Sequence, residues 1–494
     1  MIQLTDNISN EKALANAVQR FRERQIVLPT FEQQKDPSLV PQKIKEKLKS
    51  IGLWELHPLN LFRITWKNEP VEQGGLFGKV NYLELPSSIT GVEARIVMLV
   101  GKWFPTGAHK VGAAYGCLAP QIITGGYDPT YHKAVWPSTG NYCRGGAFDS
   151  KLMGCESVAI LPEEMSKERF DWLRDVIGSE VIATPGCESN VKEIYDACWE
   201  IRRTRPDCII FNQFEEFGNA AWHYNVTGTA LREAYELVKT PASNIAAYVS
   251  ATGSAGTIAG GDYLRTVAPH LKVVASEALQ CPTLLMNGFG GHRIEGIGDK
   301  HVPWVHNVKN TDVVTAIDDE DCMRIFRLFN EKKGQEYLLS QGVEKETVAQ
   351  LPLLGISCIA NMLSAIKTAK YFEMTADDVI LTIATDSADL YRSRLEELTE
   401  QKGEYSGLQA ARDFEKCIFG TTTDYMKELG YHDKKAIHNL KYFTWIEQQE
   451  KDLEDLNQMW YDRDLWPKLF SQVHRWDEMI NEFNERTGVM KTLV

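Results

Sequence analysis

The sequence predicts an α/β protein in which parallel strands alternate with covering helices. Short runs rich in β-branched residues recur along the middle of the chain, and longer amphipathic segments separate them. A short apolar run between polar turns is typical of a buried strand, and an apolar period of 3.6 residues is typical of a helix packed on a sheet. Their alternation is the order expected of parallel sheets with crossover helices.

The individual elements follow from these patterns in chain order. We expect strands at residues 94–100, 156–162, 180–184, 245–250, 272–277 and 379–384. We expect helices at residues 166–178, 188–203 and 218–238, where apolar side chains recur on one helical face. The chain shows no internal repeat and no low-complexity tract.

The two ends of the chain differ from its middle. The first part holds polar helical stretches and an aromatic linker, and the last part is charged and aromatic with almost no strand pattern. We expect an N-terminal extension at 1–85, a catalytic core at 86–395 with a smaller nested domain at about 117–212, and a helical C-terminal extension at 396–494. The extension's large apolar side chains would pack on the core or on another subunit: Trp445, Trp460, Trp466 and Trp476.

Composition and charge restrict the class of protein. The chain has 494 residues, 43% of them hydrophobic and 24% charged, and a formal net charge of −13. An acidic surface argues against nucleic acid or an anionic membrane as the main partner. No stretch approaches the ~20 apolar residues of a spanning helix and the first residues lack a signal-peptide core, so we expect a cytoplasmic protein. The ten cysteines show no zinc-binding spacing, so we expect reduced thiols and no metal site.

The first chemical motif is WFPTGAHKVGAAYG, residues 103–116. Lys110 follows a buried strand and a Pro-Thr-Gly turn, and it stands where a helix of small residues begins. Desolvation there would favour the neutral amine and allow imine formation. From this stretch alone the favoured interpretation is a surface loop lysine, and a histidine beside a turn, such as His109, is more often a structural residue than a proton carrier.

The second motif is Ser138-Thr139-Gly140-Asn141-Tyr142, which precedes the small residues of a helix start. Hydroxyls and backbone N–H groups would gather at a positively polarised helix N-terminus, which favours a carboxylate. The alternative is an ordinary N-cap with a turn glycine.

The third motif is ATGSAGTIAGG, residues 251–261, directly after the strand at 245–250. The backbone N–H groups from Gly253 to Thr257 can wrap an anion, and two hydroxyls add donors. The spacing matches neither the dinucleotide fingerprint nor the P-loop, so the motif predicts a monophosphate ligand. A tight turn that needs glycine only for its geometry is the alternative.

The fourth motif is ATDSADLY, residues 384–391, at the end of the last predicted strand. A neutral hydroxyl such as that of Ser387 could hydrogen-bond a ring nitrogen without protonating it. The alternative is a plain turn at a strand end.

Together and in this order, the four motifs resemble those of the β-family, or fold type II, of pyridoxal-phosphate enzymes, which includes cysteine synthase and cystathionine β-synthase. The resemblance runs from about residue 94 to residue 394. Three more stretches are similar to family segments: NQFEEFGNAAWHYNVTG at 212–228, GGHRIEGIGDKHVP at 290–303, and LGIS at 354–357.

The resemblance implies two parallel α/β domains with pyridoxal 5′-phosphate between them. It places Lys110 at the position of the Schiff-base lysine that also removes the substrate's α-proton, Asn141 at the cofactor's 3′-oxygen, and Ser387 at the pyridine nitrogen. The substrate-carboxylate loop would consist of Ser138, Thr139, Gly140 and Asn141. The phosphate would be held by Gly253, Ser254, Ala255, Gly256 and Thr257.

The chain also departs from the family pattern beside the substrate. Tyr142 follows Asn141 where the family has threonine, and the TGAHK context of Lys110 is more similar to the tryptophan synthase β subunit. The resemblance implies a lyase or transferase of amino-acid metabolism that performs β-elimination or β-replacement on a small β-substituted amino acid, either cysteine synthase-like or cysteine/serine lyase-like. An ammonia-lyase, a dehydratase, a racemase or a thiolase subunit shares the same framework. A homodimer or higher homo-oligomer is expected.

Overall fold

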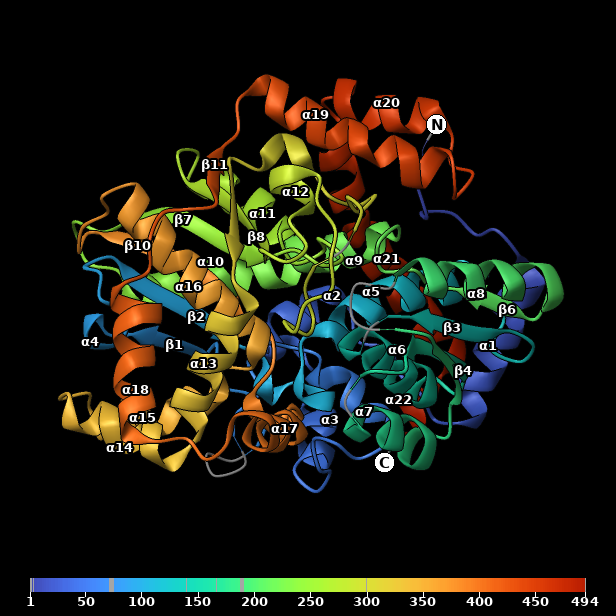
Figure 1. The fold of residues 1–494 in the computed structure, drawn as a ribbon. Coiled ribbons are helices and arrows are strands. Elements are labelled where there is room, and N and C mark those ends of the chain that lie inside the picture. Colours follow the sequence, from blue (N-terminus) through green and yellow to red (C-terminus); the bar gives the residue numbers. More distant parts are fainter. Residues whose placement is uncertain are drawn as a thin grey trace.

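Two sheets of mainly parallel strands organise the chain (Figure 1). The computed structural model describes residues 2, 4–70, 75–138, 140–165, 167–186, 191–298 and 300–493. The large sheet has the order β1-β2-β10-β7-β8-β9-β11, and the small sheet the order β5-β4-β3-β6. In Figure 1 the small sheet lies on the right and the large sheet on the left. The predicted α/β class with parallel sheets is confirmed.

The strands have the following bounds: β1 Tyr82–Leu85, β2 Arg95–Val100, β3 Lys133–Pro137, β4 Glu156–Pro162, β5 Glu180–Thr184, β6 Cys208–Ile210, β7 Asn244–Ala251, β8 Lys272–Ala278, β9 Val313–Ile317, β10 Asp378–Ala384 and β11 Met426–Glu428. All six predicted strands are present. The inner strands of both sheets pair in parallel, whereas β1 and β11 pair antiparallel at the two edges of the large sheet.

Helices connect and cover the strands. They are α1 Glu11–Glu23, α2 Phe31–Lys35, α3 Gln42–Leu48, α4 Ser87–Thr90, α5 Lys110–Ile123, α6 Asn141–Leu152, α7 Lys167–Asp171, α8 Val191–Thr204, α9 Phe217–Trp222, α10 Gly228–Val238, α11 Ala259–Val267, α12 Thr283–Met286, α13 Asp319–Asn330, α14 Lys332–Ser340, α15 Lys345–Gln350, α16 Ile356–Tyr371, α17 Arg392–Lys402, α18 Gly407–Phe414, α19 Tyr431–Lys441, α20 Leu453–Tyr461, α21 Leu465–Thr487 and α22 Val489–Thr492. The predicted helix at 166–178 corresponds to α7 and a π-helical turn, Trp172–Ile177.

Strand β2 shows why both faces of the large sheet are buried. Val97 and Leu99 belong to the apolar core that includes α10, whereas Ile96 and Met98 belong to the core that includes α16. Side chains alternate between the two faces of a strand, so a continuous apolar run fills both cores. A strand buried in this way has its carboxyl end fixed, and the chain leaves β2 toward Lys110 at that end.

The two terminal extensions pack on each other and on the core. The rings of Phe21 on α1 and Phe483 on α21 lie 5.0 Å apart, and those of Phe31 and Trp476 lie 5.6 Å apart. In the C-terminal extension the predicted tryptophans are buried within the chain: Trp445, Trp460, Trp466 and Trp476. This part also contributes strand β11, so it is not wholly helical. Figure 1 shows α19 and α20 at the top of the view, above α12.

Within the described ranges, no single helix has both the length and the apolar composition to cross a membrane. Helix α15 with its following turn and α16 are long and apolar enough only when they are counted together, and a bend of 119° separates them.

A buried basic cluster joins the C-terminal extension to the core. His438 and Lys441 lie on α19, and His306 lies before β9; none is more than 3% exposed. Lys441 Nζ donates to the carbonyl oxygens of Trp304 at 2.9 Å and His306 at 2.8 Å. Burial, with a smaller effect of the Lys441 ammonium, lowers the pKa of both histidines to about 3. Both rings are therefore neutral in the folded protein above that pH.

This cluster predicts acid sensitivity. As the pH falls from about 6.5, the ordinary histidine pKa, toward 3, the unfolded chain binds protons at His306 and His438 that the folded chain does not bind. Each pH unit in this window should then lower the free energy of unfolding by about 1.4 kcal/mol per histidine. Urea unfolding midpoints between pH 7 and pH 4 would measure the slope. His438→Gln should flatten it, and His474→Gln, at an exposed position of α21, should not; equal slopes in all three proteins would contradict the prediction.

Candidate active site

Lys110 is the first residue of α5, which follows β2 after two short helical turns, Gly101–Trp103 and Pro105–Gly107. The preceding turn contains Thr106 with a φ of 68°, a left-handed conformation that is strained for a β-branched residue. Lys110 Nζ donates hydrogen bonds to Gln213 Oε1 at 3.1 Å and to Ser254 Oγ at 3.0 Å. Two neutral acceptors thus hold the amine at the start of a helix.

Two glycines allow the Gln213 segment to approach Lys110. A Cβ atom on Gly116 of α5 would lie 2.4 Å from the carbonyl oxygen of Gly218, and a Cβ on Gly218 would lie 2.1 Å from that of Gly116. These separations are shorter than any real Cβ contact, so only glycine permits α5 and α9 to touch. The residues just before α9, which include Gln213, are consequently placed beside the amine.

Gln213 connects the amine to the predicted carboxylate loop. Its Nε2 donates to Ser138 Oγ at 3.1 Å, and the backbone N–H of Gly140 donates to the same hydroxyl at 3.3 Å. Asn219 Nδ2 donates to Ser254 Oγ at 3.1 Å and to the carbonyl of Gln213 at 2.9 Å. The structure therefore brings Lys110, Ser138, Gly140 and Ser254 together. Thr139 lies outside the described residues.

The loop from Gly253 to Thr257 lies between β7 and α11 and has the form of an anion cradle. Ala255 has a φ of 57°, which turns successive N–H groups toward one side. None of the described residues accepts a hydrogen bond from the backbone N–H groups of Gly253, Ser254, Ala255, Gly256 and Thr257. A Cβ on Gly256 would lie 2.0 Å from Asn219 Oδ1, so a side chain there would displace Asn219.

Asn141 opens α6 and reaches toward the end of β10. Its Nδ2 donates to Asp386 Oδ2 at 2.6 Å, and the Tyr391 hydroxyl donates to the same oxygen at 2.6 Å. Its Oδ1 is buried and has no partner within the described ranges. Burial raises the pKa of Asp386, although the bonds from Tyr391 and Asn141 act in the opposite direction.

Ser387 is not part of the network around Lys110. Its hydroxyl donates to Asp389 Oδ2 at 3.5 Å, and it lines a cavity of about 580 Å³ with Trp54 and Lys102. The role inferred for it stays a prediction. Another serine, Ser357 at the start of α16, lies near the phosphate loop, because Gly296 approaches both Gly253 and Ser357.

His109 packs behind Lys110 as a structural residue. It is 1% exposed, and its ring lies 5.5 Å from that of Trp66 and 4.9 Å from that of His223. Burial, and secondarily the adjacent Lys110 ammonium, lowers its pKa well below the ordinary value. The imidazole is therefore neutral, and the structural interpretation of this residue is favoured.

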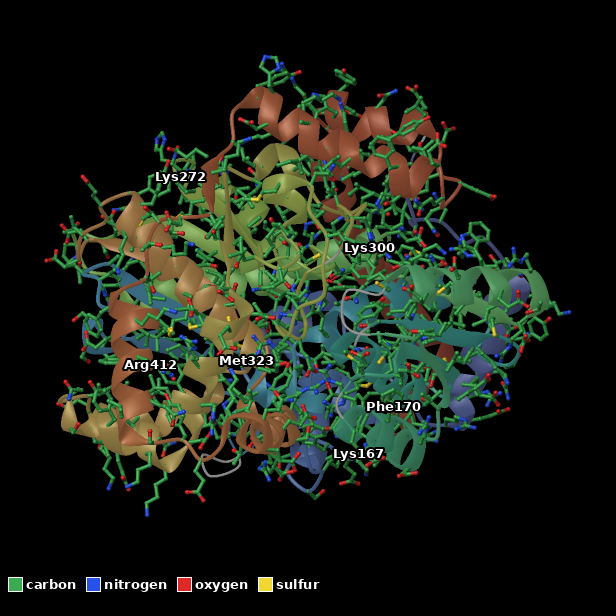
Figure 2. All side chains as sticks on the ribbon, in the orientation of Figure 1. Lys167, Phe170, Lys272, Lys300, Met323 and Arg412 are labelled. Carbon is green, nitrogen blue, oxygen red and sulfur yellow. The ribbon has the colours of Figure 1, made fainter. Side chains whose placement is uncertain are left out.

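Arg169 on α7 spans from the small sheet to the large one. Its Nη1 lies 2.6 Å from Glu295 Oε2, and Arg394 Nε donates to Glu295 Oε1 at 2.6 Å. A Cβ on Gly140 would lie 2.4 Å from Arg169 Nη1, so the guanidinium rests directly on the carboxylate loop. A cavity of about 480 Å³ is lined by Glu295 and Arg394 and also by Met323. Figure 2 labels Met323 on α13, and Lys167 and Phe170 on α7.

Several residues of this site were not assigned from the sequence. Gln213 could have been found, because it lies in the quoted 212–228 segment. Asp386 lies in the quoted 384–391 segment, but its partner Asn141 is 245 residues away in the chain. Arg169 carried no local signal, because its partner Tyr391 is 222 residues away.

Comparison with known proteins agrees with this geometry. A family described as pyridoxal-phosphate dependent enzymes matches residues 102–340. The probable cysteine synthase of Bacillus subtilis (strain 168) is 27% identical over 301 residues, which cover 61% of this chain and 89% of that protein. Cystathionine β-synthase of Saccharomyces cerevisiae is 24% identical over 366 residues, which cover 72% of this chain and 68% of that protein.

Solved structures show the same fold. A hydrogen sulfide-producing enzyme from Fusobacterium nucleatum has a TM-score of 0.53 at 22% identity, over 64% of this chain and 97% of that one. The O-acetylserine dependent cystathionine β-synthase from Helicobacter pylori also has a TM-score of 0.53 at 22% identity, over 64% of this chain and 95% of that one.

The described residues fit pyridoxal phosphate. Lys110 offers an amine, the loop from Gly253 to Thr257 offers N–H donors that no described residue occupies, and Asn141 offers a buried amide with an unpartnered oxygen. A phosphate suits a glycine-rich loop before a helix, and a carbonyl carbon suits a lysine amine. The chain is therefore a pyridoxal-phosphate-dependent enzyme with the fold type II architecture, and it is similar to the cysteine synthases and cystathionine β-synthases.

Proposed function

We propose that this enzyme catalyses β-elimination or β-replacement on a small β-substituted amino acid, as a lyase or transferase. The observation that carries the proposal is the position of Lys110, whose amine lies between Gln213 and Ser254 and is linked through Gln213 to the loop of Ser138 and Gly140. A base next to a carboxylate-binding loop suits removal of a proton α to a carboxylate. The relatives named cysteine synthase and cystathionine β-synthase support this choice of reaction.

The roles of the chain's own residues follow from their contacts. When bound, pyridoxal phosphate supplies an electron sink that acidifies the substrate's α-proton. The Gly253–Thr257 loop would hold its phosphate through backbone N–H groups. Lys110, when neutral, can accept the α-proton at Nζ and then return it to the leaving group. Gln213 and Ser254 fix the direction of the amine.

The substrate's carboxylate would bind at the start of α6. The Ser138 hydroxyl, the Gly140 region and the positive end of the α6 dipole provide donors there. Arg169, Glu295 and Arg394 close this side of the site with side chains that are mostly buried. Exclusion of water strengthens each of these polar interactions.

We further propose a cytoplasmic enzyme that works as a homodimer or higher homo-oligomer. The cysteines within the described ranges are free thiols, which supports a reducing compartment. Large exposed aromatic side chains on the C-terminal extension, among them Tyr431, Phe443 and Tyr461, support a contact between subunits.

A panel of β-substituted amino acids tests the reaction. We expect the purified holoenzyme to release pyruvate and ammonia from at least one of them, or to form a new β-substituted amino acid when a thiol is added. Product analysis by mass spectrometry would distinguish elimination from replacement. Exchange of the α-proton with solvent, without any loss of the β-substituent across the panel, would contradict the proposal and favour a racemase or thiolase-like activity.

A further inference from the structure

Arg144 is a buried guanidinium close to the candidate active site. It lies on α6, three residues after Asn141, and is 5% exposed. Its Cζ lies 5.5 Å from the ring of Trp54 and 4.8 Å from the ring of Trp172. Its Nε is buried without a hydrogen-bond partner, and no carboxylate of the described residues pairs with it.

The nearby acidic groups are already engaged. Glu295 is shared between Arg169 and Arg394, and Asp386 accepts hydrogen bonds from Asn141 and Tyr391. Arg394 also pairs with a third carboxylate, that of Glu397, at 2.7 Å, and burial raises the pKa of Asp386. None of these carboxylates forms an ion pair with Arg144. A buried cation without a nearby anion is energetically unfavourable unless a bound ligand neutralises its charge.

The indole rings do not satisfy the guanidinium. Trp54 and Trp172 are close enough for cation–π contact, which uses the faces of the planar group. The N–H donors at its edge point in the plane and remain available for a planar or tetrahedral anion. Burial and the neighbouring Arg169 lower the pKa of Arg144 to about 10, which leaves the group charged at neutral pH.

Arg144 also lies where the side chain of a bound amino acid could reach. Arg169 rests on Gly140 of the carboxylate loop, and Arg144 is one helical turn beyond Asn141. One turn of helix rises about 5.4 Å, which is comparable to the length of an amino acid with a substituted β-carbon. The α-carboxylate and a second anionic group could therefore contact the start of α6 together.

We propose that Arg144 binds a second anionic group, a carboxylate or a phosphate, on the β-substituent of the amino-acid substrate. This inference rests on the proposed function and specifies its substrate class: β-substituted amino acids with a negatively charged side chain. The buried positive charge of Arg144 is then neutralised when such a substrate binds. A neutral β-substituent leaves it without a partner.

Binding to the holoenzyme tests this proposal through the visible absorbance of the cofactor. O-phosphoserine, O-succinylserine and O-acetylserine supply a phosphate, a carboxylate and a neutral group on the same β-oxygen. Arg144→Gln should raise the apparent Kd for the two anionic ligands about 10- to 100-fold and that for O-acetylserine less than about twofold. Arg174→Gln is the matched control, because Arg174 is an exposed arginine over the Phe170 ring on the same side of the molecule.

Several outcomes would overturn the inference. Equal weakening of all three ligands, or of none, would make Arg144 a structural residue. Thermal unfolding gives a second measurement: Arg144→Met removes an unpaired buried charge and keeps apolar contact with the tryptophans, so it should not lower the melting temperature. A marked decrease would assign Arg144 to the fold instead. Reaction of neutral ligands with no preference for charge would reject only this inference, whereas failure of every ligand to bind or react would reject the proposed function as well.

Discussion

Replacing Lys110 by alanine should reduce turnover by about 10³-fold or more while leaving the protein folded. Lys110 Nζ lies between Gln213 Oε1 and Ser254 Oγ, beside the loop predicted to bind the substrate's carboxylate. A positioned acid–base group contributes about 10²- to 10⁴-fold, and loss of covalent attachment adds to this. The rate of product release from the best β-substituted amino acid would measure the effect.

Attachment of the cofactor gives an independent measurement. Borohydride reduction of the wild-type protein, followed by peptide mapping, should place the pyridoxyl group on Lys110. Lys151→Ala, at an exposed position near the end of α6, is the control and should retain both label and turnover. A label on another lysine, or full activity of Lys110→Ala, would remove Lys110 from the mechanism.

The sequence predicted six of the eleven described strands and missed inner strands, among them β3 in the small sheet, as well as edge strands. The predicted strands share a continuous apolar run, because strands buried on both faces need no polar alternation. Strand β11, Met426–Glu428, is short, polar and at the sheet edge, so it carries no such run. Strand β6, Cys208–Ile210, is too short to be recognised. Strand β9, Val313–Ile317, has the same apolar pattern as the predicted strands and could have been found.

In the candidate site, too, features formed by adjacent residues could be predicted, and contacts between distant segments could not. Lys110 and the Gly253–Thr257 loop could be recognised from the sequence, because a turn, a helix start and a glycine-rich loop each consist of adjacent residues. Packing between distant segments brings Asp386 and Arg169 into the site. For example, Arg169 donates a hydrogen bond of 3.4 Å to Tyr391, which is 222 residues away in the chain. Such pairs depend on how the small sheet is placed against the large one, which no local pattern encodes.

The buried charge of Arg144 could also not be read from the sequence. An arginine on an amphipathic helix is usually solvated or paired. The positions of Trp54, from the N-terminal extension, and Trp172 show that this one is covered, and no carboxylate of the described residues forms an ion pair with it. The extension therefore takes part in forming the surroundings of the site.

Gly256→Val should weaken binding of pyridoxal phosphate by about 100-fold or more, with a much smaller effect on turnover of the saturated enzyme. The new Cβ would lie 2.0 Å from Asn219 Oδ1 and 2.4 Å from its Cγ, so either Asn219 or the loop must move. Overpacking of this kind costs about 1–3 kcal/mol. Misdirected N–H donors lose charge-assisted hydrogen bonds of about 1.5–3 kcal/mol each, and together these losses exceed a hundredfold.

The effect should be graded along the same loop. The atom nearest to a Cβ at Gly253 would be the Gly296 carbonyl oxygen, at 3.3 Å. Gly253→Ala should therefore weaken cofactor binding less than Gly256→Ala does. Gly407→Val, at a position with nothing within 4 Å, controls for the substitution itself. Equilibrium dialysis of the cofactor would give each Kd. Because the phosphate loop lies away from the α-proton that Lys110 removes, kcat at saturating cofactor should fall less than about tenfold. Unchanged cofactor affinity in Gly256→Val would mean that the loop is a turn and that the phosphate is bound elsewhere.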